Sequence, residues 1–152
     1  MTVRRRTLVT AAPAAPLAAC GEAAVKVFPT FASAMSAIEG LARGHRHTGA
    51  WTLAQMLTHA VQSIDYSIDG FPQMKSALFR KAVGSVAFAV FQARGKMGHT
   101  LTEPIPGAPA LDAQAPLDKA IALALAALRR SEAHSGALAP HFDYGQLDKV
   151  QY

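Results

Sequence analysis

The residues best suited to chemistry share one face of a predicted helix. At 100° per residue, that face carries Gln55, His59, Gln62, Ser63 and Tyr66. A neutral imidazole is a good ligand for zinc, nickel or iron, and the amides, hydroxyl and phenol beside it would line a pocket. The same face equally suits the solvated side of an amphipathic helix, with His59 an ordinary hydrogen-bonded residue. One histidine never fixes a metal, so the spacing leaves both interpretations open.

Other groups that could bind a metal lie in predicted loops or at helix ends. They are His45, His47, His99, His134, His141 and Asp143. Because His141 stands between Pro140 and Phe142, the sequence favours packing or capping for it over metal binding. Asp65 and Asp69 are predicted to face solvent and not to form a catalytic pair. The chain has no Gly-rich phosphate loop, no His-Glu-x-x-His and no nucleophile elbow, so those enzyme classes are not indicated.

Hydrophobic periodicity predicts four helices that position these groups. They are expected at about residues 31–42, from Leu53 to just before Gly70, at about 75–94 and at about 117–134. Thr52 is the expected N-cap of the second helix, and Gly70 then Pro72 end it. The third is apolar nearly all round and predicts a central buried helix, with Gly84 at a close helix contact. Residues 102–116 hold four prolines and predict an irregular strap; without strand-like alternation, an all-α bundle follows.

The N-terminus has the order of an export signal. Arg5 and Arg6, followed by Thr7-Leu8-Val9, resemble a twin-arginine signal, and Leu17-Ala18-Ala19-Cys20 resembles the lipobox of bacterial lipoproteins. We therefore expect a signal peptide at 1–19, a tether at 20–28, lipidation of Cys20 and a membrane-anchored periplasmic protein. The partners would be the export machinery and the lipid anchor. The alternative is a basic Ala/Pro-rich tail in which the cysteine falls by chance.

Charge and cysteine content exclude further classes. The chain has 152 residues, 15 Lys plus Arg, 10 Asp plus Glu and a formal net charge of +5. Residues 1–19 hold three of the basic residues and no acid, so residues 20–152 carry 12 basic and 10 acidic residues, a formal +2. No basic stripe is interleaved with aromatics, so nucleic acid is not an expected partner. A single cysteine excludes an internal disulfide and a multi-thiolate metal site.

Several segments together resemble a known bacterial family. They run from Trp51 to Ala60, Ser63 to Pro72, Lys75 to Phe79, Glu103 to Pro109 and Pro140 to Leu147. The family is domain of unknown function 1569, of the DinB-like (DinB/YfiT) four-helix-bundle superfamily, and the resemblance covers roughly residues 27–152. It implies an up-down-down-up bundle over 29–152 whose last helix is missing beyond Tyr152.

The resemblance also implies a metal site. The superfamily typically holds a divalent metal (Zn, Ni or Fe) through three histidines, of which one matches His59. The other two come from a pair on the last helix and are expected beyond Tyr152, so the chain as given could lack the metal. By analogy the function would be a metal-dependent thiol transferase or isomerase acting on a small-molecule substrate. The alternative is a non-catalytic, membrane-tethered binding or structural bundle, and a homodimer is compatible with either.

Overall fold

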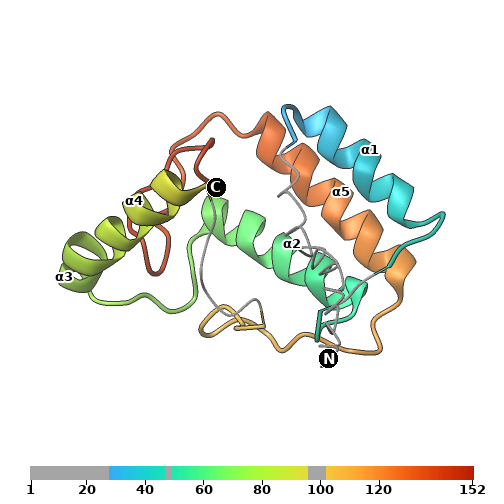
Figure 1. Ribbon diagram of the computed structural model, residues 1–152, viewed down its shortest axis with the longest axis horizontal. Coiled ribbons are helices and arrows are strands. Elements are labelled where there is room, and N and C mark those ends of the chain that lie inside the picture. Colours follow the sequence, from blue (N-terminus) through green and yellow to red (C-terminus); the bar gives the residue numbers. More distant parts are fainter. Residues whose placement is uncertain (1–27, 47–48, 96–101) are drawn as a thin grey trace, which may run out of the picture.

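The regular structure of the protein is helical (Figure 1). The computed structural model describes residues 28–46, 49–95 and 102–152. Its helices are α1 (Phe31–Leu41), α2 (Leu53–Asp69), α3 (Ala77–Phe79), the π-helix η1 (Arg80–Gly84), α4 (Ser85–Arg94) and α5 (Leu117–Ala133). Within these ranges no strand forms, and His141 and Gly145 make an isolated antiparallel bridge. The predicted all-α class is therefore confirmed, and the predicted helices agree with the observed ones to within two residues.

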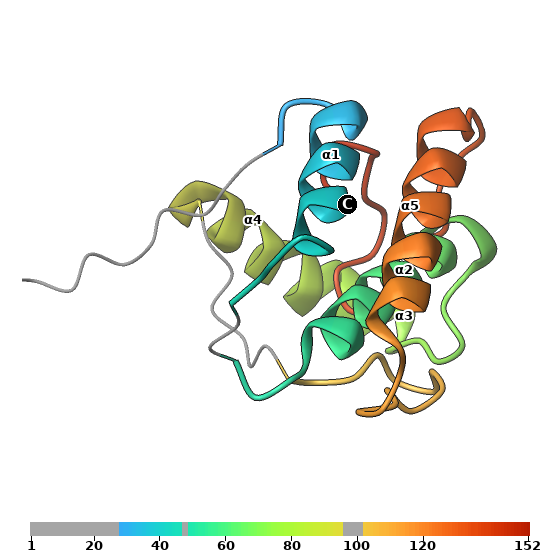
Figure 2. The ribbon, with the colours of Figure 1, turned by 90° about the vertical axis from the view of Figure 1, so that its right-hand side faces the viewer.

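Helix α5 is the element against which α1 and α2 pack. It lies along α2 on one side and α1 on the other, as Figures 1 and 2 show. The centre of this packing is formed by Ala54 and Leu57 of α2 with Ala120, Ile121 and Ala124 of α5. Alanine side chains let the two backbones approach closely, and their burial removes apolar surface from water. This core fixes the position of α2, the helix that carries His59.

Local signals set both ends of α2. The Thr52 hydroxyl accepts the backbone N–H of Gln55 at 3.2 Å, while the Gln55 side chain accepts the backbone N–H of Thr52 at 2.9 Å. This capping box satisfies two N–H groups that the first turn leaves without helical partners. At the other end Gly70 takes a positive φ of 97° and donates its N–H to the carbonyl of Tyr66. The predicted cap at Thr52 and the predicted stop at Gly70 are both observed.

Helices α3, η1 and α4 form one continuous arm, residues 77–94, which we call the helical arm. The prediction of a central buried helix here is wrong, because Leu78 is 77% exposed and Val86 is 59% exposed. Only Gly84 and Phe88 of the arm are buried. Among the described elements, no helix-to-helix packing joins the arm to α1, α2 or α5. An apolar pattern on all sides indicates that some face is covered, but it does not say that a helix covers it.

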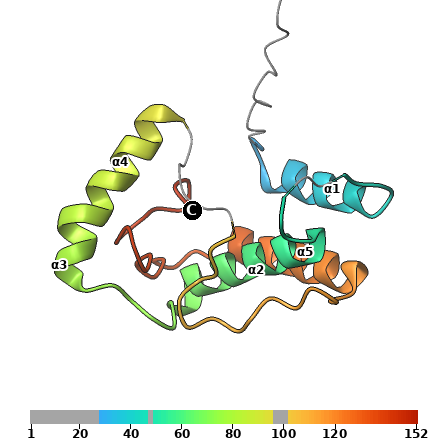
Figure 3. The same cartoon turned by 60° about the horizontal axis from the view of Figure 1, so that its bottom comes forward.

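A loop segment covers the buried face of the arm. Residues 138–152, which we call the C-terminal segment, lie between the arm and α2 (Figure 3). The backbone N–H of Ala139 donates to the carbonyl of Ser67 at 2.7 Å, and that of Lys75 donates to the carbonyl of Phe142 at 3.1 Å. Gly84 lies against the backbone of Asp143, so the close contact predicted at Gly84 is made with this segment and not with a helix. The up-down-down-up bundle stays a prediction.

The proline-rich residues 102–116, the strap, are irregular as predicted and lie against α2. Two amides on the polar face of α2 hold the strap by its carbonyl groups. Gln55 Nε2 donates to the carbonyl of Leu111 at 3.2 Å, and Gln62 Nε2 donates to that of Pro109 at 2.9 Å. These bonds hold the middle of the strap against α2 at positions on either side of His59.

Several predicted features lie outside the described residues. These are the signal peptide at 1–19, nearly all of the tether at 20–28, Arg5, Arg6, Cys20, His47 and His99. In the part of the chain that is described, none of the helices has the length and apolar character needed to cross a bilayer.

Candidate functional site

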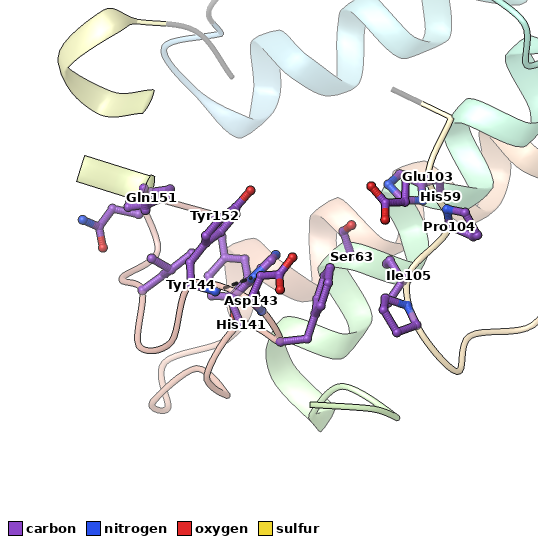
Figure 4. A pocket seen from close by; sticks show the side chains of 14 residues that line it. His59, Ser63, Glu103, Pro104, Ile105, His141, Asp143, Tyr144, Gln151 and Tyr152 are labelled. Carbon is purple, nitrogen blue, oxygen red and sulfur yellow. Dashed lines mark hydrogen bonds between the residues drawn. The ribbon is translucent and has the colours of Figure 1, made fainter. Parts of the chain in front are cut away.

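A cavity of about 270 Å³ lies between α2, the helical arm, the strap and the C-terminal segment (Figure 4). Each of these four elements contributes side chains. The lining consists of His59 and Ser63 from α2, Phe88 from α4, Glu103, Pro104, Ile105 and Pro106 from the strap, and His141, Phe142, Asp143, Tyr144, Leu147, Gln151 and Tyr152. Segments far apart in the sequence therefore meet at one place.

The polar groups are distributed on two sides of the cavity. In Figure 4, His59 and Glu103 lie on one side, His141, Asp143 and Tyr144 lie on the other, and Ser63 lies between them. His59 and Ser63 are four residues apart on α2, so they occupy the same face one turn apart. The ring of Trp51, just before the cap of α2, lies 5.1 Å from the ring of His59, centroid to centroid. Trp51 thus packs near the start of α2 against the side chain of His59.

His141 organises the turn on the far side. Its Nδ1 accepts the backbone N–H of Asp143 at 3.1 Å and that of Tyr144 at 3.3 Å. A neutral imidazole that accepts at Nδ1 carries its proton on Nε2, so these bonds assign the tautomer. The ring also stacks on Phe142 at 4.4 Å and on Tyr144 at 4.6 Å between centroids. These contacts match the packing or capping role that the sequence favours for His141.

Of the four predicted pocket residues, one lines the cavity beside His59 and three do not. Ser63 lines the cavity, whereas Gln55, Gln62 and Tyr66 do not. Gln55 and Gln62 hold the strap, and the ring of Tyr66 packs against Phe71 at 5.8 Å. The polar face of α2 is therefore divided between fastening the strap and lining the cavity.

Sequence reasoning missed Glu103, Phe88 and Tyr152 as lining residues. No spacing rule connects these positions to His59, because loops bring them there. The nearest signal was that Glu103 opens one of the segments that carry the family resemblance.

The fold also determines the surroundings of the two tyrosine phenols in the cavity. Burial raises the pKa of Tyr152 to about 12, and burial followed by the charges of Asp143 and Glu103 raises the pKa of Tyr144, so both phenols are protonated at neutral pH.

A metal centre is not assembled by the described residues alone. Within residues 28–46, 49–95 and 102–152, no three or more His, Cys, Asp or Glu side chains are grouped so that they could hold an ion. The described residues therefore supply one of the three ligands that the resemblance implies, His59. A metal at His59 stays a prediction.

Comparison with known proteins identifies the family. The family model described as protein of unknown function (DUF1569) matches residues 26–152. The chain belongs to this family, as its motifs predict. No curated protein and no solved structure matches the chain. Function must therefore be argued from the cavity itself.

Proposed function

We propose that this member of the DUF1569 family binds a small organic molecule in the cavity between α2, the helical arm, the strap and the C-terminal segment. One observation carries the proposal: four separate elements enclose about 270 Å³ and direct into it both apolar and polar side chains. Small-molecule sites are concave, mainly apolar and supplied with a few polar groups. The volume is slightly below the range typical of drug-sized ligands, so the ligand is small.

The contacts of His141 support binding more than catalysis. Its Nδ1 already accepts two backbone N–H groups, so taking a proton at that atom would break the turn that carries Asp143 and Tyr144. A general base needs an accepting atom within reach of the proton it removes. We therefore assign His141 to the structure of the site. The non-catalytic binding protein of the sequence analysis becomes the preferred function.

The test uses fragment screening by NMR on 15N-labelled residues 20–152. We expect fragments of about ten non-hydrogen atoms to shift the amide signals of His59, Ser63 and residues 141–144. Ser63→Phe fills the cavity and should abolish these shifts. Ser36→Phe makes the same change at an exposed position of α1 and should leave them intact. Shifts that survive Ser63→Phe, or no shifts with any fragment, would refute the proposal.

A divalent metal (Zn, Ni or Fe) at His59 is the second candidate, favoured by the position of His59 in the cavity wall. A metal at this residue would agree with membership of the DinB-like superfamily. By analogy with that superfamily, the activity would then be metal-dependent thiol transfer or isomerisation. Elemental analysis of protein expressed from the full-length gene without its signal tests it, with His59→Ala as the variant and His45→Ala as the control. Metal that is absent from the parent, or unchanged in His59→Ala, rules this candidate out.

Export is the remaining part of the proposal and rests on the N-terminal sequence. Arg5 and Arg6 would direct the chain to the twin-arginine route, and two acyl chains on Cys20 would anchor it in the periplasm. Mass spectrometry of protein extracted from membranes should find a chain that begins at lipidated Cys20. An intact Met1 or an unmodified thiol at Cys20 would contradict the lipoprotein.

A further inference from the structure

The walls of the cavity carry negative charge as well as aromatic rings, and both features affect which small molecules can bind. Glu103 and Asp143 contribute carboxylates, and among the described residues that line the cavity none is a lysine or an arginine. The two carboxylates come from different elements, the strap and the C-terminal segment, and Figure 4 draws them on opposite sides. A molecule held between them therefore meets a negative potential from both directions.

The charges of Glu103 and Asp143 both act on a third residue of the cavity, Tyr144. The pKa of Tyr144 is raised first by burial and then by the charges of Asp143 and Glu103. A phenol whose ionisation is opposed by both carboxylates lies within the field of both. The field that opposes a negative phenolate favours a positive ligand at the same place.

Aromatic rings supply the complementary surface. Phe88, Phe142, Tyr144 and Tyr152 line the cavity together with the imidazole of His141. Phe88 lies 5.4 Å from Tyr144 between ring centroids, and His141 lies 6.0 Å from Tyr152, so the rings form one continuous group. The faces of aromatic rings attract cations, and groups of such rings are used to hold alkylated ammonium groups.

We infer that the ligand is a small organic cation, an alkylated ammonium, held between Glu103 and Asp143 against the rings of Tyr144 and Phe88. This inference rests on the proposed function, because it names the chemical class that the cavity takes. The carboxylates provide the charge preference and the rings provide a surface for the alkyl groups. A neutral molecule of equal shape would keep the ring contacts and lose the charge attraction.

Three probes of nearly equal shape test the inference by NMR titration of residues 20–152. They are choline as the cation, 3,3-dimethylbutan-1-ol as the neutral isostere and 3,3-dimethylbutanoate as the anion. We expect choline to bind about tenfold or more tightly than the alcohol and the anion to bind most weakly. Added salt should weaken choline binding more than binding of the alcohol.

Two variants identify the charges responsible. Glu103→Gln and Asp143→Asn should each weaken choline binding by about three- to tenfold and leave the alcohol nearly unchanged. Glu39→Gln, at an exposed position of α1, is the matched control and should change neither. If the alcohol and the anion bind as well as choline, the inference fails while the proposed function stands. If none of the three binds but other fragments do, the inference also fails, and if no small molecule binds, both fail.

Discussion

A methyl group at Gly84 would lie 1.9 Å from the carbonyl oxygen of Asp143 and 2.9 Å from its carbonyl carbon. Gly84 ends the π-helix η1, and Asp143 is part of the turn that His141 holds at one wall of the cavity. The absence of a side chain at one position of the helical arm thus permits the backbone of the C-terminal segment to approach. The shape of the cavity depends on this approach.

Gly84→Ala should therefore destabilise the protein. Alanine is favoured over glycine in a helix by about 1 kcal/mol, but here the added carbon meets backbone, which cannot rotate away as a side chain can. We expect a net loss of about 1–3 kcal/mol in the free energy of unfolding, measured by urea denaturation, with altered amide shifts at residues 141–145.

Gly40→Ala is the control for that substitution. The nearest atom to a methyl group there is Arg43 Nη2, the end of a flexible side chain, at 3.5 Å. This variant should keep or gain stability, by up to about 1 kcal/mol. If Gly84→Ala behaved like Gly40→Ala, the close approach of Gly84 and Asp143 would not be tight in solution.

Thr52→Ala should weaken the start of α2. It removes the hydroxyl that caps Gln55 N–H and separates the Gln55 side chain from its reciprocal partner. The expected loss is about 1 kcal/mol in the free energy of unfolding, measured by thermal or urea denaturation. Thr58→Ala changes the same residue type inside α2, where the hydroxyl only donates back to the carbonyl of Ala54, and should cost much less. Equal losses in the two variants would argue against the capping box.

Arg130→Gln should change how stability depends on acid pH. Arg130 donates to Asp69 through both Nη atoms and to Asp65 through Nη1, which joins α5 to α2. The hydrogen bond from Arg130 is the main reason that the pKa of Asp69 is lowered from 3.8. A lowered folded-state pKa contributes stability that is present above pH 3.8 and is lost as pH falls through the folded-state value.

The measurement is urea unfolding at pH 7 and at several values below 4. Because Arg130 and Asp69 are exposed, the loss of stability that their interaction causes at acid pH is small. This loss should be absent in Arg130→Gln. Arg129→Gln removes the neighbouring exposed charge and should retain the full acid dependence. An unchanged pH profile in Arg130→Gln would show that the bond to Asp69 does not form in solution.

Ionisation of the Tyr152 phenol should make the protein less stable at alkaline pH. Its phenol donates to the carbonyl of Ala139 at 2.8 Å, and burial raises its pKa to about 12. A group whose pKa is raised on folding contributes stability below its unfolded value, near 10, and this contribution is lost as pH rises through the folded value. Absorbance titration of tyrosinate should show a component near pH 12 that is missing in Tyr152→Phe and absent from the parent in urea.

Much of the helical structure was readable from residues close together in sequence. The cap at Thr52, the stop at Gly70 and the irregular proline-rich strap follow from local chemistry, and each is observed. His59 was identified by its place on a polar helix face, and it lines the cavity. These features depend on a few neighbouring residues, so one sequence is enough to predict them.

Features that depend on loop paths were not predictable in the same way. The helical arm was expected to be buried, yet Leu78 and Val86 are exposed, because the C-terminal segment covers only the face with Gly84 and Phe88. The amide of Gln62 was expected to line the pocket, and it holds the strap instead. Glu103 reaches the cavity because the strap crosses α2, and no periodicity within the strap encodes that crossing.

The π-helical turn in the arm sets the rotational phase of everything that follows it. Since a π turn contains one residue more than an α turn, the five residues from Arg80 to Gly84 advance the chain by an angle that ordinary helix geometry would not give. If the same five residues were wound as an α-helix instead, each would turn the chain further, and α4 would be rotated by roughly one residue's turn, about 100°. Phe88 would then leave the cavity wall and another side of α4 would replace it. The π-helical form of this one turn therefore determines which side chains of α4 a ligand meets.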